Sequence, residues 1–160
     1  KVLTRTAIRA RLREARTRGL RVVFTNGCFD VLHTGHLHLP QRARALGDLL
    51  VVGINDDRSV RRLKGPGRPL VGHNQRAEVL ASLGCVDYVT VFTETNPLRL
   101  ILSVRPDVLV KGADYTLEEV VGREEVEGAG GRIELIPLLP GFSTSALART
   151  LSQGTPGRRP

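Results

Sequence analysis

The sequence has few aromatic residues and few cysteines, and both shortages narrow the classes of protein to which it can belong. Its 160 residues include two tyrosines, four phenylalanines and no tryptophan, which leaves little surface for stacking on single-stranded bases. Two cysteines, Cys28 and Cys85, are too few for a disulfide framework or a cysteine-based zinc site. No apolar run is long enough to cross a membrane, and the basic N-terminus lacks the apolar core of a secretory signal. We therefore expect a reduced, cytoplasmic protein with no membrane partner.

Positive charge is plentiful, but it is concentrated at one end of the chain. The formal net charge is +8, and residues 1–21 hold eight basic residues and one acid, a net of +7. Apolar residues in this segment recur at helical spacing, which predicts a basic amphipathic helix within residues 1–20 that packs on the rest of the protein. An RNA contact or an anionic-surface contact is the alternative. We favour a solvated helix face and expect no nucleic-acid partner.

The remaining length favours a single domain with one substantial core. We place it at residues 21–153, followed by a Gly-, Pro- and Arg-rich tail at 154–160 that is expected to fray. Apolar runs typical of strands alternate with helical patterns along the domain. Strands are predicted at 21–24, 49–54, 88–92, 108–110 and 132–136, with helices at 37–46, 74–83, 96–105, 117–121 and 143–152.

This alternation predicts an α/β fold, a Rossmann-like doubly wound sheet of about five parallel strands with helices on both faces. Ligands in such folds bind beyond the carboxyl ends of the strands. Polar clusters fall at those ends, at residues 26–36, 55–57, 111–114 and 143–145. The ligand site is therefore expected where these clusters meet.

The stretch from Thr25 to His36 is the most informative part of the sequence. It reads Thr-Asn-Gly-Cys-Phe-Asp-Val-Leu-His-Thr-Gly-His and leads from an apolar run into a helical segment. A helix that starts at such a turn offers free N–H groups and a positive dipole end, which suits a phosphate. His33 and His36 share one helix face, and Gly35 lets an anion approach the backbone. Because no G-x-G-x-x-G follows the strand, the pattern indicates a triphosphate site and not a dinucleotide site.

The two histidines also allow other interpretations. They could form a surface pair at a helix cap, or Cys28 and His38 could join them in a metal site. We favour phosphate binding and expect His38 to be structural or peripheral.

The same stretch resembles a known family. His33-Thr34-Gly35-His36 resembles the H-x-G-H signature of the nucleotidyltransferase superfamily, and the twelve-residue run is similar to one branch, the bacterial sugar-phosphate adenylyltransferases that make nucleotide-activated heptose. The resemblance extends from about residue 21 to residue 151. It implies transfer of AMP from ATP to D-glycero-D-manno-heptose 1-phosphate, with ADP-heptose and pyrophosphate as products. It also implies that Mg²⁺ accompanies ATP and keeps most of its waters.

The resemblance further implies a role for each candidate residue. His33, His36 and Lys64 are the expected catalytic groups, because they would stabilise charge on the α-phosphate and the leaving pyrophosphate. The nucleotide is expected to contact Thr25, Asn26, Gly27, Phe29, Gly35, Ser143, Thr144 and Ser145. The acceptor is expected to contact Asp30, Arg76, Lys111 and Asp114. No protein side chain is assigned to a metal.

Most of these assignments have a plainer alternative. Lys64 lies in a basic Gly/Pro-rich stretch, residues 61–69, whose composition predicts a mobile surface loop. Arg76 could form a surface salt bridge, and Asp114 could be a turn residue. Residues 143–145 could simply cap the last helix, and Arg149 is a possible stand-in for the basic residue that the family carries nearby.

Partners follow from the resemblance as well. The expected substrates are ATP and a sugar 1-phosphate, and a homodimer is the expected assembly. This branch is often fused to a sugar kinase, and nothing kinase-like fits in these 160 residues, so we expect a separate heptose kinase upstream. The alternatives are a cytidylyl- or other nucleotidyltransferase acting on a different sugar or polyol phosphate, and a non-catalytic nucleotide- or RNA-binding module.

Overall fold

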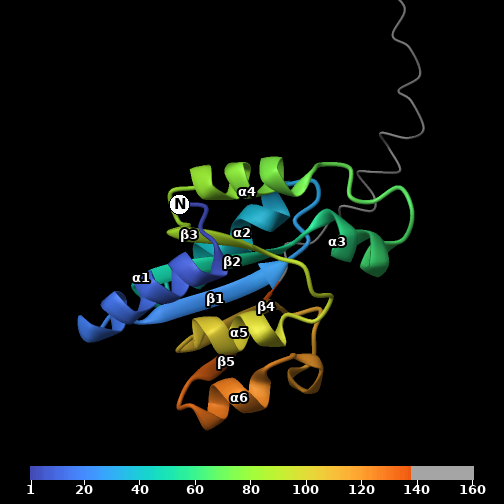
Figure 1. Cartoon of the computed structure of the whole chain (residues 1–160). Coiled ribbons are helices and arrows are strands. Elements are labelled where there is room, and N and C mark those ends of the chain that lie inside the picture. Colours follow the sequence, from blue (N-terminus) through green and yellow to red (C-terminus); the bar gives the residue numbers. More distant parts are fainter. Residues whose placement is uncertain (138–160) are drawn as a thin grey trace, which may run out of the picture.

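The computed structural model describes residues 1–137, and its centre is one sheet of parallel strands (Figure 1). The strands are β1 (Val22–Gly27), β2 (Leu49–Asn55), β3 (Tyr88–Phe92), β4 (Val108–Gly112) and β5 (Arg132–Ile136). They lie in the order β3-β2-β1-β4-β5, and every neighbouring pair is parallel. The predicted doubly wound α/β fold is confirmed. Because the order reverses beside β1, the topological switch point lies between β1 and β4.

Helices cover both faces of the sheet, so the central strands are apolar on both sides. Helices α2 (Thr34–Arg44) and α4 (His73–Ser82) pack on one face, where Ala43 and Leu80 meet Leu50 and Val52. Helices α1 (Arg5–Thr17), α5 (Leu98–Val104) and α6 (Arg123–Gly128) lie against the other face (Figure 1). The core is therefore divided by the sheet into two layers.

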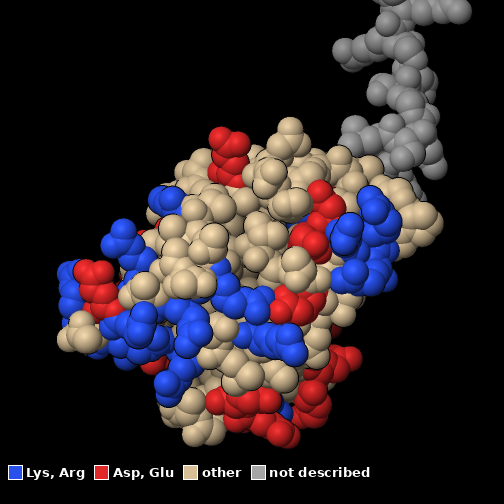
Figure 2. Space-filling view, viewed as in Figure 1, with Lys and Arg blue, Asp and Glu red and all other residues tan. Residues whose placement is uncertain are grey.

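The basic helix α1 is held to the domain by apolar and polar contacts. Ile8 and Leu12 are fully buried against the second face. Ahead of the helix, Val2 forms a parallel bridge to Val89. Arg5, the first residue of the helix, donates to both carboxylate oxygens of Glu94 at 2.9 Å. Basic side chains gather over α1 and the neighbouring α5, whereas acidic side chains gather over α6 (Figure 2).

Two local elements differ from the predictions. Residues 61–64 were predicted as loop but form the last turn of α3 (Asp57–Lys64). The start of this helix is capped by the Asp56 side chain, which accepts the N–H of Ser59 at 2.7 Å. The helix ends at Gly65, whose φ of +91° favours glycine, and cations in its last turn suit the helix dipole. The 117–121 segment is a single 3-10 turn, Leu117–Glu119, and α6 follows it unpredicted. The helix predicted at 143–152 lies outside the described residues.

Candidate active site

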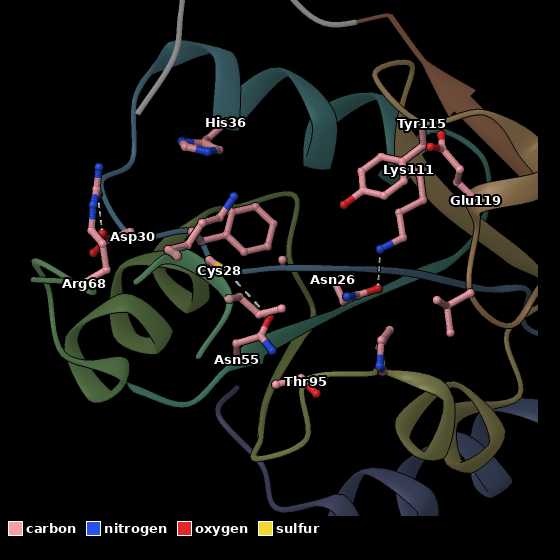
Figure 3. A pocket seen from close by; sticks show the side chains of 16 residues that line it. Asn26, Cys28, Asp30, His36, Asn55, Arg68, Thr95, Lys111, Tyr115 and Glu119 are labelled. Atoms are coloured by element: carbon pink, nitrogen blue, oxygen red, sulfur yellow. Dashed lines mark hydrogen bonds and ion pairs between the residues drawn. The ribbon is translucent and has the colours of Figure 1, made fainter. Parts of the chain in front are cut away.

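A cavity of about 500 Å³ opens at the carboxyl ends of β1, β2 and β4 (Figure 3). It lies at the switch point, where ligands of such sheets bind. Its lining comes from widely separated parts of the chain: Asn26, Gly27, Cys28, Phe29, Asp30, His36, Asn55, Leu63, Lys64, Arg68, Thr95, Pro97, Lys111, Tyr115, Glu119 and Val121. Seven predicted site residues thus line one cavity. Six of them lie between the end of β1 and the end of α3, and the seventh is Lys111 from β4.

The two histidines of the H-x-G-H segment stand together at the start of α2. His33 is the N-cap of the helix and His36 lies in its first turn, with ring centroids 3.9 Å apart and the rings tilted by 30°. His36 lines the cavity, and the Phe29 ring lies 5.8 Å from it. Phe29 has a φ of +47°, a region that non-glycine residues seldom occupy and that recurs at functional sites.

Burial keeps both imidazoles neutral. It lowers the pKa of His36 to about 4, with a further contribution from His33, and it lowers the pKa of His33 as well. A neutral imidazole still carries one N–H donor. At pH 7 the pair is therefore polar but brings no full charge of its own to the site.

The opposite side of the cavity carries a buried cation. Lys111 is 7 % exposed, and its ammonium donates a 2.7 Å hydrogen bond to Asn26 Oδ1. Its Nζ lies 5.4 Å from the centroid of the Tyr115 ring. Burial lowers the pKa of Lys111 to about 8, although Asp114 opposes the shift. A cation in this setting gains from an anionic partner.

Gly27, Cys28 and Asn55 also line the cavity. A Cβ at Gly27 would come within 3.2 Å of the Phe29 ring, so a side chain there would displace that ring. Asn55 lines the cavity from the end of β2, and its Nδ2 donates to the carbonyl of Glu94 at 3.2 Å. Burial raises the pKa of the Cys28 thiol, which faces Asn55 Oδ1 at 3.9 Å.

The predicted acceptor ligand Arg76 has a different role in the structure. Its side chain is fully buried, away from the cavity lining. Nε donates to the carbonyl of Val71 at 2.8 Å, Nη1 to that of Cys28, and Nη2 to the carbonyl of Asn55 at 2.9 Å and to Asp57 Oδ1 at 2.8 Å. With its donors engaged by the protein, Arg76 ties the ends of β1 and β2 to α3. Arg76 lies four residues before the apolar Leu80 and therefore on the same face of α4, which could have indicated that its side chain is buried.

Two other predicted residues, Thr25 and Asp114, are not among the residues that line the cavity. Thr25 is fully buried within β1. Asp114 is exposed, and its charge acts to raise the pKa of Lys111 and of Tyr115. Gly35 is the second residue of α2. Ser143, Thr144, Ser145 and Arg149 lie outside the described residues.

Sequence reasoning missed several cavity residues that neighbour the recognised motifs. Tyr115 follows the Lys-Gly-Ala-Asp segment, whereas Asn55 lies in the 55–57 cluster that was expected at the site but was given no role. Thr95 and Glu119 carry no pattern that points to the site. Within residues 1–137, no three His, Cys, Asp or Glu side chains are grouped to hold a metal ion, so the metal site considered around Cys28 and His38 is not supported there. The helices of the same segment include none that is long and apolar enough to span a membrane.

Comparison with known proteins identifies the family. Residues 24–148 match the cytidylyltransferase-like family. The bifunctional protein HldE of Syntrophotalea carbinolica is 58% identical over 145 residues, which is 91% of this chain and 30% of that protein. HldE of Geobacter sulfurreducens is 60% identical over 130 residues, or 81% of this chain and 26% of that protein. The chain thus spans less than a third of the length of these relatives.

Solved structures share the fold. The lipopolysaccharide core biosynthesis protein from Thermoplasma volcanium superposes with a TM-score of 0.63 and 26% identity, covering 76% of this chain and 98% of that one. The pantoate-beta-alanine ligase from Francisella tularensis gives a TM-score of 0.62 at 14% identity, with 94% and 76% covered. At that identity the second likeness concerns the fold alone.

Proposed function

Because the chain belongs to the cytidylyltransferase-like family, we propose that it transfers AMP from ATP to D-glycero-D-manno-heptose 1-phosphate. The products are ADP-heptose and pyrophosphate. The twelve-residue run that resembles the heptose branch supports this substrate choice. Identities of 58% and 60% to proteins named HldE support it further.

The observation that carries the proposal is the arrangement of cationic and donor groups around one cavity. His36 and Lys64 line it from α2 and α3, whereas Lys111 lines it from β4 (Figure 3). A triphosphate on the histidine side and an acceptor phosphate on the Lys111 side would meet between them. Two anions must approach each other in this reaction, and separate positive groups offset their repulsion.

The proposed chemistry is an in-line displacement. An ionised phosphate oxygen of the sugar attacks the α-phosphorus of ATP and forms the new P–O bond. The bond from that phosphorus to the β-phosphate oxygen breaks, and pyrophosphate leaves with the electron pair. The nucleophile is already ionised at pH 7, so no general base is required. Catalysis then consists of positioning and of charge stabilisation by His33, His36 and Lys64.

We propose that Mg²⁺ enters with ATP. The described residues offer no side-chain cage for it. Of the cavity carboxylates, Asp30 is engaged by Arg68, and Glu119 by Thr116. The ion is therefore expected to be coordinated mainly by phosphate oxygens and water, which suits the reluctance of Mg²⁺ to shed its waters.

We also propose that the heptose 1-phosphate is made by a kinase activity outside these 160 residues, that the protein works in the cytoplasm, and that it forms a homodimer. The length and the bifunctional name of the relatives fit a neighbouring phosphorylating step. Light scattering of the purified protein tests the dimer.

One assay tests the activity. Four nucleoside triphosphates are each combined with several sugar and polyol phosphates, and pyrophosphate release is measured. We expect release above background with ATP and the heptose 1-phosphate. Release with CTP and another acceptor would instead identify a sister activity. Nucleotide binding without turnover for any pair would favour a non-catalytic module.

A further inference from the structure

Asp30 stands at the cavity wall, but its carboxylate points into the loop between α3 and α4. Its Oδ2 accepts from Arg68 Nη1 at 2.5 Å, and its Oδ1 accepts the N–H groups of Leu70 at 2.7 Å and Val71 at 3.0 Å. The side chain is 6% exposed and that of Arg68 is 18% exposed. Both carboxylate oxygens therefore accept hydrogen bonds from this loop.

Within residues 1–137, the start of this loop has few packing contacts. Gly65 and Gly67 have positive φ values of +91° and +83°, and a Cβ built at either would touch nothing within 4 Å. Leu70 is 52% exposed. Glycines in open space restrict the backbone little, so the restraint comes from Asp30 and from the bond of Arg76 Nε to the carbonyl of Val71.

We infer that Asp30 is a positioning residue: it fixes residues 65–71 so that Lys64 and Arg68 stay at the cavity wall. This inference rests on the proposed function for its catalytic consequence. The ion pair is largely shielded from solvent, where charge-assisted hydrogen bonds are strong and loss of one partner leaves the other uncompensated. The three contacts link the end of β1 directly to the loop that follows Lys64 and carries Arg68.

The competing role is direct contact with the acceptor sugar. The geometry argues against it, because Asp30 and Arg68 lie at one end of the cavity and Lys111 and Tyr115 at the other (Figure 3). A sugar hydroxyl at Asp30 would also have to compete with one cationic and two backbone donors.

A double-mutant cycle separates the two roles. The variants are Asp30→Asn, Arg68→Gln and the double substitution, with Glu78→Gln, an exposed charge on α4, as the matched control. We expect Asp30→Asn to raise the KM for ATP roughly tenfold to a hundredfold, the range for loss of one partner of a charged hydrogen bond, with the acceptor KM unchanged. The double variant should resemble either single variant, because both break one contact. A selective rise in the acceptor KM, fully additive effects, or an unchanged KM for ATP would overturn the inference.

A second readout does not depend on activity. Trypsin cuts after Lys64, whereas Pro69 blocks cutting after Arg68. The fragment ending at Lys64 should form faster from Asp30→Asn than from the parent or from Glu78→Gln, at matched melting temperature. Equal rates would contradict positioning. If the parent protein turns over no substrate pair, the proposed function fails and this comparison alone decides the role of Asp30.

Discussion

Lys111 and Asn26, which are 85 residues apart in the sequence, are joined by a 2.7 Å hydrogen bond from Nζ to Oδ1 across the switch point of the sheet. Asn26 belongs to β1 and Lys111 to β4, whose register pairs Thr25 with Val110. The strand order therefore brings the polar clusters at 26–36 and 111–114 into contact. The amide orients the ammonium without neutralising it, so its charge remains available to an anionic ligand.

The pKa of Lys111 predicts how acceptor use depends on pH. Burial lowers this pKa from 10.5 to about 8, so in the free protein the ammonium loses its proton near pH 8. We expect kcat/KM for the acceptor to fall above that pH, because kcat/KM reports the free enzyme. The value of kcat should persist to higher pH, since a bound anion raises the pKa again. Initial rates from pH 6 to 10 measure both, and a fall near pH 8 that persists in Lys111→Arg would contradict this assignment.

The lowered pKa of Lys111 also predicts how the stability of the protein changes with pH. Between pH 8 and 10.5 the unfolded chain binds more protons at Lys111 than the native protein does, so the free energy of unfolding should rise with pH in that window. Urea unfolding measured at several pH values checks this. In Lys111→Met the contribution of this group should vanish; an identical slope in both proteins would refute it.

Removal of His36 should slow turnover greatly while the fold persists. Losing one donor aimed at developing charge typically costs about 10²–10³ in kcat, and we expect at least that for His36→Ala. Because its pKa is about 4, the residue should not titrate between pH 5 and 7. His38→Ala, on the same helix but outside the cavity lining, is the control. Near-normal turnover in His36→Ala, with the melting temperature retained, would remove the triphosphate assignment.

Residues 61–68 should respond to nucleotide. We expect limited proteolysis to cut after Lys64 in the free protein and ATP with magnesium to protect that bond, because the triphosphate would lie against the cavity wall that Lys64 and Arg68 form. Lys64→Ala should slow catalysis more than Arg61→Ala, since Arg61 is exposed outside the lining. Equal cutting with and without ATP would indicate a solvated charge run with no ligand role.

Deletion of residues 1–19 should lower stability without changing the chemistry. The deletion removes the fully buried Ile8 and Leu12, and each such side chain contributes about 1.5–3 kcal/mol of burial. Thermal unfolding should show a clear drop in melting temperature, whereas kcat and KM of the folded fraction should barely change, because the cavity residues begin at Asn26.

The same truncation tests the nucleic-acid alternative. We expect the full chain to show only weak, non-specific RNA retention at low salt, with the steep salt dependence of phosphate contacts. Sequence-selective binding that persists at physiological salt and disappears on truncation would show that the basic face of α1 is a recognition surface.

Local patterns in the sequence were sufficient for the fold. The strands at Tyr88–Phe92 and Arg132–Ile136 were predicted with the observed bounds, and the remaining strands within a few residues. Buried parallel strands are short apolar runs, so hydropathy locates them directly. The family could also be predicted, because the H-x-G-H segment is a contiguous motif that can be recognised without knowledge of the fold. By contrast, Gly and Pro at 65–69 suggested a loop from residue 61, although Asp56 caps a helix that runs to Lys64.

Only the tertiary structure decided which polar side chains are engaged by other parts of the protein and which line the cavity. Asp30 and Arg76 had the composition expected of substrate ligands, yet their partners come from residues up to 48 positions away. Lys111 and Asn26 meet only because the strand order places β4 beside β1. Sequence patterns report secondary structure and motif identity, since both arise from neighbouring residues. Whether a charged side chain contacts the protein or lines the cavity depends on its burial and on its contacts with distant residues. These contacts exist only once distant strand ends are brought together.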